Sequence, residues 1–210
     1  MAIMILSGGY GIEGSCGVVV NDVEARLKLR GKRASVFRND LTALPIIGTP
    51  GCWESDIVKT LREMASKSHA FVLISPEYHG TMSSTMKLQL DWLSKDQLAG
   101  KPVALVSLLG GKSNTSTLNH MRHVCRWLGA MCIPEQIAIP HGKKHLEGGV
   151  ISDSDLSERM DLGIRFAFGY RAKTPVIKRL AGDSQTLAYL LFFAWLHLRN
   201  RLSWGLQASW

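Results

Sequence analysis

The chain has few cysteines, and none of them forms a C-x-x-C pair. The four cysteines are Cys16, Cys52, Cys125 and Cys132. Their spacing argues against a zinc ribbon and a dithiol redox motif, and it is typical of reduced thiols inside a cell. His120 and His123 stand three residues apart, but no third ligand is spaced to complete a site. We therefore predict no bound metal.

A secretory signal is also missing from the beginning of the chain. No basic segment precedes the apolar residues 2–6, and these are too few to form the apolar core of a cleavable signal. We interpret them as a first β-strand. The sequence contains no helix-turn-helix, RRM or zinc-finger pattern. We expect no nucleic-acid partner and a cytoplasmic location.

What the sequence does contain is an ordinary globular composition with an uneven distribution of charge. Of its 210 residues, 46% are hydrophobic and 20% are charged, which predicts one α/β domain with an additional segment. The net charge is +8. Residues 171–210 hold six basic residues against one acidic residue, whereas residues 1–170 hold 19 against 16. The basic tail favours an anionic surface.

We place the domain boundary between residues 1–172 and a helical tail of residues 173–210. In the tail, residues 184–198 are uncharged and mostly apolar, but they are shorter than the ~20 residues that span a membrane. Arg199 and Trp204 follow, and such residues suit a membrane interface. Two interpretations stay open. The apolar helix packs on protein, or residues 184–204 dock the chain on the inner face of an anionic membrane.

Segments with strand and helix patterns alternate along the first 170 residues. Such alternation predicts a parallel sheet covered by helices on both faces. The expected strands are residues 2–6, 34–38, 69–74, 102–108 and 136–139, and the expected helices are residues 16–29, 55–67, 85–94, 115–128 and a segment beginning near 154. This pattern predicts a doubly wound, flavodoxin-like α/β fold with five parallel strands in the order 2-1-3-4-5.

One loop at the predicted carboxyl end of a strand has the character of a ligand site. The buried strand 69–74 is followed by Pro76, Glu77, Tyr78, His79 and Gly80. In doubly wound sheets, ligands bind outside the carboxyl ends of the strands. A rigid turn with free backbone N–H groups and an aromatic ring suits a flat, hydrogen-bonding heterocycle.

A second loop, residues 7–15, is rich in glycine. Its residues 9–14 match G-x-G-x-x-G after a strand and before a helix, which is the setting of a Rossmann NAD(P) site. That fold places an acidic residue about twenty positions further on. The second strand offers only Asp40, beyond its end. The Rossmann site and a tight turn that binds nothing are the alternatives for this loop.

Residues 70–112 resemble the NAD(P)H-dependent FMN reductase family, a flavodoxin-like group. The family's Pro-Glu-Tyr-Asn-Gly-Ser loop and Leu-Lys-Asn…Asp-Trp-Leu-Ser helix are matched here by Pro76, Glu77, Tyr78, Gly80, Lys87, Asp91, Trp92, Leu93 and Ser94. His79, Ser84 and Leu88 depart from this pattern, because Asn, Gly and Asn are common there. In the order of elements, the resemblance extends over roughly residues 1–170.

The resemblance implies that FMN binds at the loops described above. The implied cofactor-binding residues are Ser7, Gly9, Gly14, Ser15, Pro76, Glu77, Tyr78, His79, Gly80, Ser107, Gly110 and Gly111. The first four would wrap the phosphate, and the others would face the flavin ring from two loops. The glycine-rich loop carries Glu13, and it lacks the basic residue that is common in the family. No residue is assigned a catalytic role, because the flavin carries the chemistry.

Individual side chains near these loops carry more specific expectations. His79 either donates a hydrogen bond to the flavin or acceptor, or it is an exposed turn residue. Glu77 is expected to be structural, either accepting backbone N–H groups or pairing with a lysine. Lys112 is expected to be a solvated loop cation. Lys87 and Asp91 are four residues apart, so they should pair on the helix surface.

The function implied by the resemblance is an NAD(P)H oxidoreductase with FMN as cofactor and NAD(P)H as co-substrate. Hydride would pass through FMN to a small acceptor such as a quinone, an azo compound, chromate or free flavin. The family further implies a homodimer or homotetramer, and Trp92 either lies at the interface or packs against the sheet. A flavodoxin-like electron carrier is the second interpretation, because carriers tend to be acidic and this chain is basic. A cofactor-free interaction module is the third.

Overall fold

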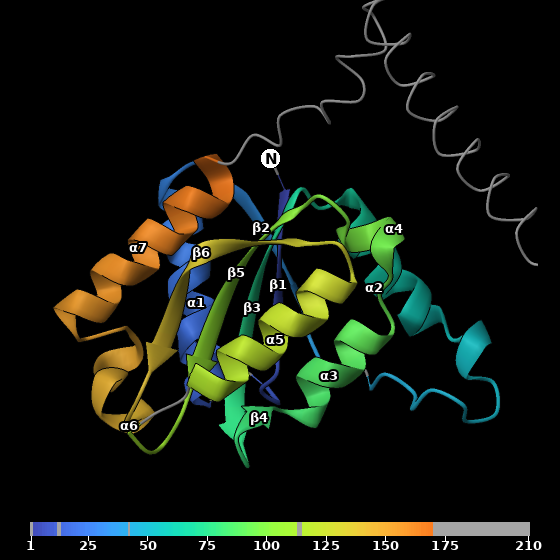
Figure 1. Cartoon of the computed structure of the whole chain (residues 1–210), viewed down its shortest axis with the longest axis horizontal. Helices are drawn as coiled ribbons and strands as arrows, with labels where there is room; N and C mark the ends of the chain where they lie inside the picture. Colours follow the sequence, from blue (N-terminus) through green and yellow to red (C-terminus); the bar gives the residue numbers. More distant parts are fainter. Residues whose placement is uncertain (1, 12–13, 42, 113–114, 170–210) are drawn as a thin grey trace, which may run out of the picture. The chain divides into compact units, whose positions relative to one another are not determined.

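A five-stranded parallel sheet forms the centre of the computed structural model, which describes residues 2–11, 14–41, 43–112 and 115–169 (Figure 1). These residues belong to the first of the two units into which the chain divides, Met1–Tyr170. The strands are β1 (Ala2–Ser7), β2 (Arg33–Phe37), β3 (Ala70–Tyr78), β5 (Pro102–Leu108) and β6 (Met131–Ile139). A two-residue strand, β4 (Thr81–Met82), pairs antiparallel with β3.

The parallel strands follow one another across the sheet as β2-β1-β3-β5-β6. With β4 set aside, this is the predicted flavodoxin-like order 2-1-3-4-5. A Rossmann sheet has the order 3-2-1-4-5-6, so the topology argues against a Rossmann site at the glycine-rich loop. The predicted fold class is confirmed, and the addition of β4 is the difference.

Helices cover both faces of the sheet. The helices are α1 (Ser15–Leu29), α2 (Asp56–Lys67), α3 (Ser84–Asp91), α4 (Lys95–Leu98), α5 (Thr115–Trp127), α6 (Gly142–His145) and α7 (Ser154–Gly169). Figure 1 shows α1 and α7 on one face and α2, α3 and α5 on the other. The sheet separates two hydrophobic cores, the first under α1 and α7 and the second under α2, α3 and α5. In β3, Val72 and Ile74 belong to the first core, and Phe71 and Leu73 belong to the second. Strands that are apolar on both sides fit this burial.

Ion pairs hold α1 and α7 together at the surface of the first core. The Arg26 guanidinium lies 2.6 Å from Asp22 and 2.9 Å from Asp161, and it donates to the Ser157 hydroxyl at 2.8 Å. Arg30 also lies 2.9 Å from Asp161. These two guanidinium groups keep the pKa of Asp161 below its usual value, against the effect of partial burial. The last described helix is thereby fixed on the sheet.

The predicted loop at residues 75–81 is partly a strand, which corrects the sequence-based interpretation. β3 continues through Pro76 and Glu77 to Tyr78, and a two-residue turn then leads into β4. His79 and Gly80 form this turn with φ angles of 52° and 78°. Two-residue hairpins with positive φ at both positions favour Asn-Gly, because Asn tolerates the left-handed region. The Asn that is common at position 79 in the family therefore has a conformational explanation.

The predicted helix over residues 85–94 corresponds to α3, which begins one residue earlier and ends at Asp91, and a separate short helix, α4, follows it. Ser83 begins α3, and its hydroxyl accepts the backbone N–H of Met86 at 3.1 Å. Lys87 and Asp91 form the expected surface ion pair. Ser94 then begins α4 with a capping box that involves Gln97.

Trp92 corrects the expectation of an interface residue. Its side chain is fully buried, and its indole N–H donates to the Pro45 carbonyl at 2.8 Å. Trp53 contacts the ring edge-on with a centroid distance of 5.2 Å, and the Arg62 guanidinium lies 5.7 Å from the ring centroid. Trp92 therefore anchors the segment that precedes α2 within one subunit, and it is not available to a second subunit.

The described residues hold no helix that is long and apolar enough to cross a membrane. The same residues contain no group of three His, Cys, Asp or Glu side chains that could hold a metal ion. The predicted domain boundary at residue 172 and the tail helix at 184–198 lie outside the described residues and stay predictions.

The hairpin turn gives a first testable prediction. We expect His79→Asn to raise the free energy of unfolding by a fraction of the about 1–2 kcal/mol that an ordinary residue loses in the left-handed region. Gly80→Ala should lower it by about that amount, because a Cβ at Gly80 meets no atom within 4 Å and the cost is purely backbone strain. Urea unfolding followed by circular dichroism measures both. A Gly80→Ala variant as stable as the natural chain would contradict the turn geometry.

Candidate functional site

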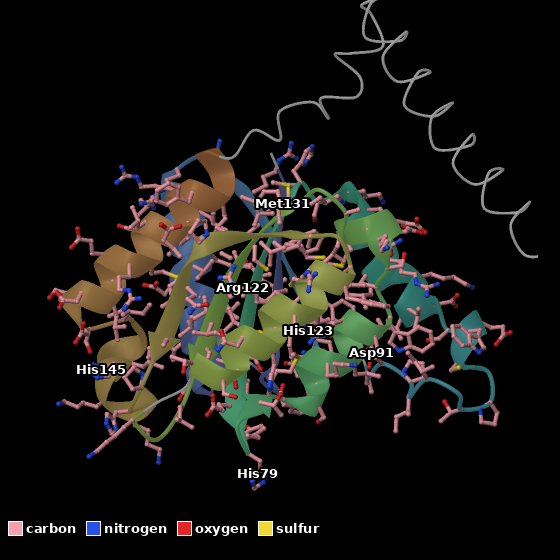
Figure 2. All side chains as sticks on the ribbon, in the orientation of Figure 1. His79, Asp91, Arg122, His123, Met131 and His145 are labelled. Atoms are coloured by element: carbon pink, nitrogen blue, oxygen red, sulfur yellow. The ribbon has the colours of Figure 1, made fainter. Side chains whose placement is uncertain are left out.

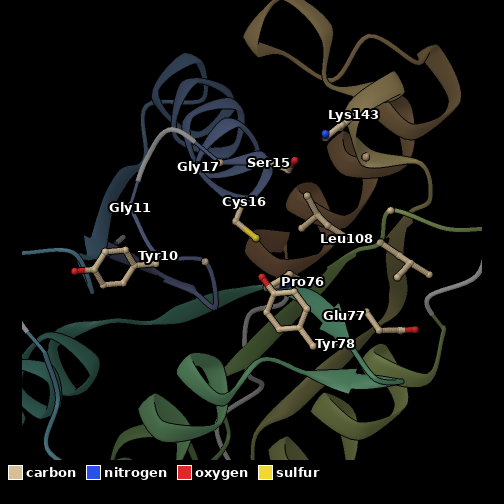
Figure 3. Close-up of a pocket in the computed structure, with 15 residues that line it drawn as sticks. Tyr10, Gly11, Ser15, Cys16, Gly17, Pro76, Glu77, Tyr78, Leu108 and Lys143 are labelled. Atoms are coloured by element: carbon tan, nitrogen blue, oxygen red, sulfur yellow. The ribbon is translucent and has the colours of Figure 1, made fainter.

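A cleft of about 380 Å³ opens where the carboxyl ends of β1, β3, β5 and β6 meet one edge of the sheet (Figure 3). It is lined by Gly9, Tyr10, Gly11, Gly14, Ser15, Cys16, Gly17, Pro76, Glu77, Tyr78, Leu108, Leu109, Gly110, Gly142 and Lys143. The glycine-rich loop and the end of β3 thus contribute to one cleft. This juxtaposition is what the flavin interpretation of the sequence requires.

The loop after β1 is held by hydrogen bonds to its backbone. The Ser7 carbonyl accepts the side-chain amides of Gln89 and Asn39, both at 2.7 Å. The Ser7 hydroxyl accepts the Gly9 N–H at 3.2 Å, and the Ser83 hydroxyl donates to the carbonyl of Gly8 at 2.7 Å. Ser7 therefore holds the loop in position through these hydrogen bonds and does not line the cleft itself.

Close packing explains why this loop contains adjacent glycines. A Cβ at Gly8 would lie 2.6 Å from the Ser83 hydroxyl oxygen, and one at Gly9 would lie 2.6 Å from the Cβ of Cys16. Neither position accepts a side chain without movement of the loop or helix. At Gly14, by contrast, a Cβ would meet nothing within 4 Å. The space there is open.

The first turn of α1 presents unpaired backbone N–H groups at the cleft. Gly14 is the N-cap residue and supplies no side-chain hydrogen bond, and no acidic residue lies in the first turn. Ser15, Cys16 and Gly17 follow it, and the N–H groups of a first turn have no acceptor within the helix. With the positive end of the helix dipole, they make this end of the cleft suited to an anion. Burial raises the pKa of the Cys16 thiol to about 12, so the thiol is neutral.

Two exposed tyrosines flank the cleft, Tyr10 from the first loop and Tyr78 from the end of β3 (Figure 3). Their exposed fractions are 79% and 60%. Glu77 also lines the cleft, but its carboxylate accepts the Thr117 N–H in the first turn of α5 at 3.3 Å. This contact agrees with the expected structural role of Glu77.

A third wall comes from the loop after β5. Leu109 donates its N–H to the Ile139 carbonyl at 3.1 Å, and the Gly142 N–H donates to the Leu109 carbonyl at 3.0 Å. Gly110 lines the cleft beside them, and a Cβ there would meet nothing within 4 Å. Lys112 is exposed and does not line the cleft, as expected.

The cleft gathers seven of the twelve residues that the sequence indicated. These are Gly9, Gly14, Ser15, Pro76, Glu77, Tyr78 and Gly110. Ser107 is buried in β5, and Gly111 lies just past the lining residues. His79 and Gly80 lie in the hairpin turn, and Figure 2 shows His79 at its tip. For His79, this position matches the expectation of an exposed turn residue.

Sequence reasoning missed the contribution of the segment after β6. Gly142 and Lys143 belong to α6, and both line the cleft. A signal was present, because a glycine closely following a strand at the carboxyl edge of a parallel sheet is a candidate ligand contact.

A second groove of about 440 Å³ lies next to the cleft and shares Tyr10 with it. Its other lining residues are Asn39, Ala43, Leu44, Ile46, Ser84, Thr85, Lys87, Leu88 and Asp91. The groove therefore runs between α3 and the segment that follows β2. Its lining is mostly apolar.

Comparison with known proteins places this architecture among flavin enzymes. Residues 1–144 match the model of a family described as NADPH-dependent FMN reductase. An NADPH-dependent FMN reductase ArsH from Acidithiobacillus ferrooxidans is 30% identical over 148 residues, which are 67% of this chain and 61% of that protein. An FMN-dependent NADPH-azoreductase from Staphylococcus saprophyticus is 40% identical over 81 residues, which are 39% of this chain and 43% of that protein.

Solved structures show the same fold at lower identity. The apo form of the NADH:FMN oxidoreductase EMOB superposes with a TM-score of 0.69 at 16% identity, over 82% of this chain and 91% of that one. The present chain spans about three fifths of the length of the ArsH relative. Because the family match covers well over half of the residues, the chain belongs to the NADPH-dependent FMN reductase family.

Proposed function

We propose that the chain is an FMN-dependent NAD(P)H oxidoreductase that reduces a small acceptor. The observation that carries this proposal is the shared cleft of the glycine-rich loop and the end of β3. Family membership and the activities for which two relatives are named support it. Bound FMN would supply the redox chemistry by accepting hydride from NAD(P)H and giving it to the acceptor.

The residues of the cleft fit FMN. Open space at Gly14 and Gly110 leaves room for a ligand against the backbone. The first turn of α1 offers N–H groups for the phosphate, since no side chain caps this helix. The end of β3 and the loop after β5 form two walls for a flat ring. Tyr10 and Tyr78 add exposed aromatic surface beside them.

Two side chains that line the described cleft, Glu77 and Cys16, are not placed to act as an acid or base. The Glu77 carboxylate is held by α5, and the thiol of Cys16 is neutral. Hydride transfer depends on stacking and alignment, which a rigid cleft provides. Quinones, azo compounds, chromate and free flavin are acceptors compatible with such a site, and one relative is an azoreductase.

We further propose that the groove shared with Tyr10 faces a second copy of the chain, in a homodimer or homotetramer. Leu41, Ile46 and Trp53 are 70%, 68% and 62% exposed along the segment before α2. Exposed apolar side chains that gather beside a groove mark interaction surfaces. A second subunit on this face would also cover the part of the cleft in which the acceptor would bind.

The first prediction from the proposed function concerns the cofactor. The purified full-length chain should bind added FMN, and anaerobic NADPH or NADH should bleach the visible flavin bands. Absorption spectra recorded with and without each nucleotide measure this. A bound flavin that neither nucleotide reduces would favour the electron carrier, and a chain that binds no flavin would favour the interaction module.

The second prediction separates binding from folding at Gly14. The backbone of Gly14 is extended, with φ −80° and ψ 172°, so any residue is accepted there. Gly14→Asp should improve the N-cap by a few tenths of a kcal/mol. The Gly14→Asp variant should nonetheless bind FMN more than about tenfold more weakly, because the new carboxylate would repel the phosphate of FMN. Gly14→Asn, with the same shape and no charge, is the matched control, and equal FMN affinity in both variants would contradict the phosphate position.

The third prediction tests the second subunit. We expect Ile46→Asp to shift the chain toward the monomer, because a charge replaces an exposed apolar contact. Light scattering after size exclusion measures the mass. Lys59→Asp on the exposed surface of α2 is the control and should leave the mass unchanged. If the natural chain is itself a monomer at micromolar concentration, the dimer proposal is wrong.

A further inference from the structure

The cleft contains a cation that comes from a different part of the chain than the glycine-rich loop. Lys143 is the one Lys or Arg among the described residues that line it, and Glu77 is the one acidic residue. The Glu77 carboxylate accepts the Thr117 N–H of α5, and it forms no ion pair with Lys143 in the described part of the chain. Lys143 itself makes no ion pair or hydrogen bond with any described residue. Its ammonium is therefore available to a ligand.

The segment that carries Lys143 lies against the first turn of α1. A Cβ on Gly142 would lie 4.0 Å from the Ser15 hydroxyl oxygen. Figure 3 shows the side chains of Ser15 and Lys143 at the same end of the cleft, away from Tyr78. The cation and the N–H groups of the first turn of α1 thus lie at the same end of the cleft, where an anion is expected.

Hydrogen bonds fix this segment at its beginning. The His141 N–H donates to the Gly111 carbonyl, and the Gly142 N–H donates to the Leu109 carbonyl, both at 3.0 Å. His141 has a φ of 47°, so it occupies the left-handed region without being glycine. Such strained residues persist where surrounding contacts hold them, and they are frequent at ligand sites.

The end of the segment is fixed as well. The Ser152 N–H donates to the His145 carbonyl at 2.9 Å, and the His145 ring nitrogen Nδ1 lies 3.4 Å from the Asp153 carboxylate. Asp153 also accepts the Leu156 N–H at 3.0 Å at the beginning of α7. Lys143 therefore projects from a segment that is anchored on both sides.

We propose that Lys143 binds the phosphate monoester of the flavin nucleotide and makes this chain select FMN over unphosphorylated riboflavin. The inference rests on the proposed function and deepens it. Lys143 replaces, from the carboxyl end of β6, the basic residue that the glycine-rich loop lacks. A lysine acts on phosphate as a point charge, so its contribution falls as salt rises.

The test compares two flavins that differ only in the phosphate. The full-length natural chain and the variants Lys143→Gln, Lys144→Gln and Lys143→Arg are titrated with FMN and with riboflavin, and dissociation constants are taken from quenching of flavin fluorescence. Lys144 is the matched control, because it is the exposed neighbour and does not line the cleft. Urea unfolding establishes that each variant is folded.

We expect Lys143→Gln to raise the FMN dissociation constant by about tenfold and to change that of riboflavin by less than about twofold. Lys144→Gln should change neither, and Lys143→Arg should retain most of the preference. Raising the salt concentration should weaken FMN binding more in the natural chain than in Lys143→Gln.

Two results would overturn the assignment of Lys143 and leave the proposed function untouched. One is FMN binding in Lys143→Gln equal to that in Lys144→Gln. The other is a loss of FMN and riboflavin affinity by the same factor in Lys143→Gln, which would indicate a change of cleft shape. A natural chain that binds neither flavin would overturn the proposed function together with this inference, so the two failures are distinguishable.

Discussion

The site depends on the main-chain carbonyl of Ser7, which accepts two side-chain amides at the end of β1. Gln89 reaches it from α3 and Asn39 from beyond β2, both at 2.7 Å, so two other segments of the chain fix the loop that begins there. Gln89 is fully buried, and its Nε2 also donates to the Thr85 carbonyl, while its Oε1 has no partner among the described residues. A buried unpaired oxygen costs about 1–3 kcal/mol. The chain bears this cost at the base of the cleft, where the loop must hold one position.

Most of the fold could be predicted from the sequence, because the strands are apolar on both faces and alternate with helices. β5 has the predicted bounds, and the parallel order follows from the topology rules for such chains. Tertiary contacts decided the rest. Nothing local indicates that Pro76 to Tyr78 continue β3, because their partner is the two-residue strand β4. The burial of Trp92 depends on Pro45, Trp53 and Arg62, which are far away in the sequence.

The candidate site was predictable where glycines and serines follow a strand directly, as at Gly9, Gly14 and Ser15. It was not predictable at Lys143, since a lysine in a polar loop has the same local pattern whether or not it faces a cleft. Only the position of β6 beside β5, with the hydrogen bond between Gly142 and Leu109, brings that loop to the site. Ser107 shows the opposite error, because its place in β5, between β3 and β6, buries it.

The nucleotide-binding part of the cleft is made largely of main-chain atoms from the turns of α1, β3 and β5. This composition affects how the site evolves. Peptide N–H groups are present whatever side chains accompany them. Amino-acid replacements around the cleft therefore leave the N–H donors for a nucleotide in place. The tyrosines and apolar residues around it are then free to diverge under selection for different acceptors. A scaffold of this kind changes its acceptor through the surrounding side chains, while close packing keeps Gly8 and Gly9 at the centre unchanged.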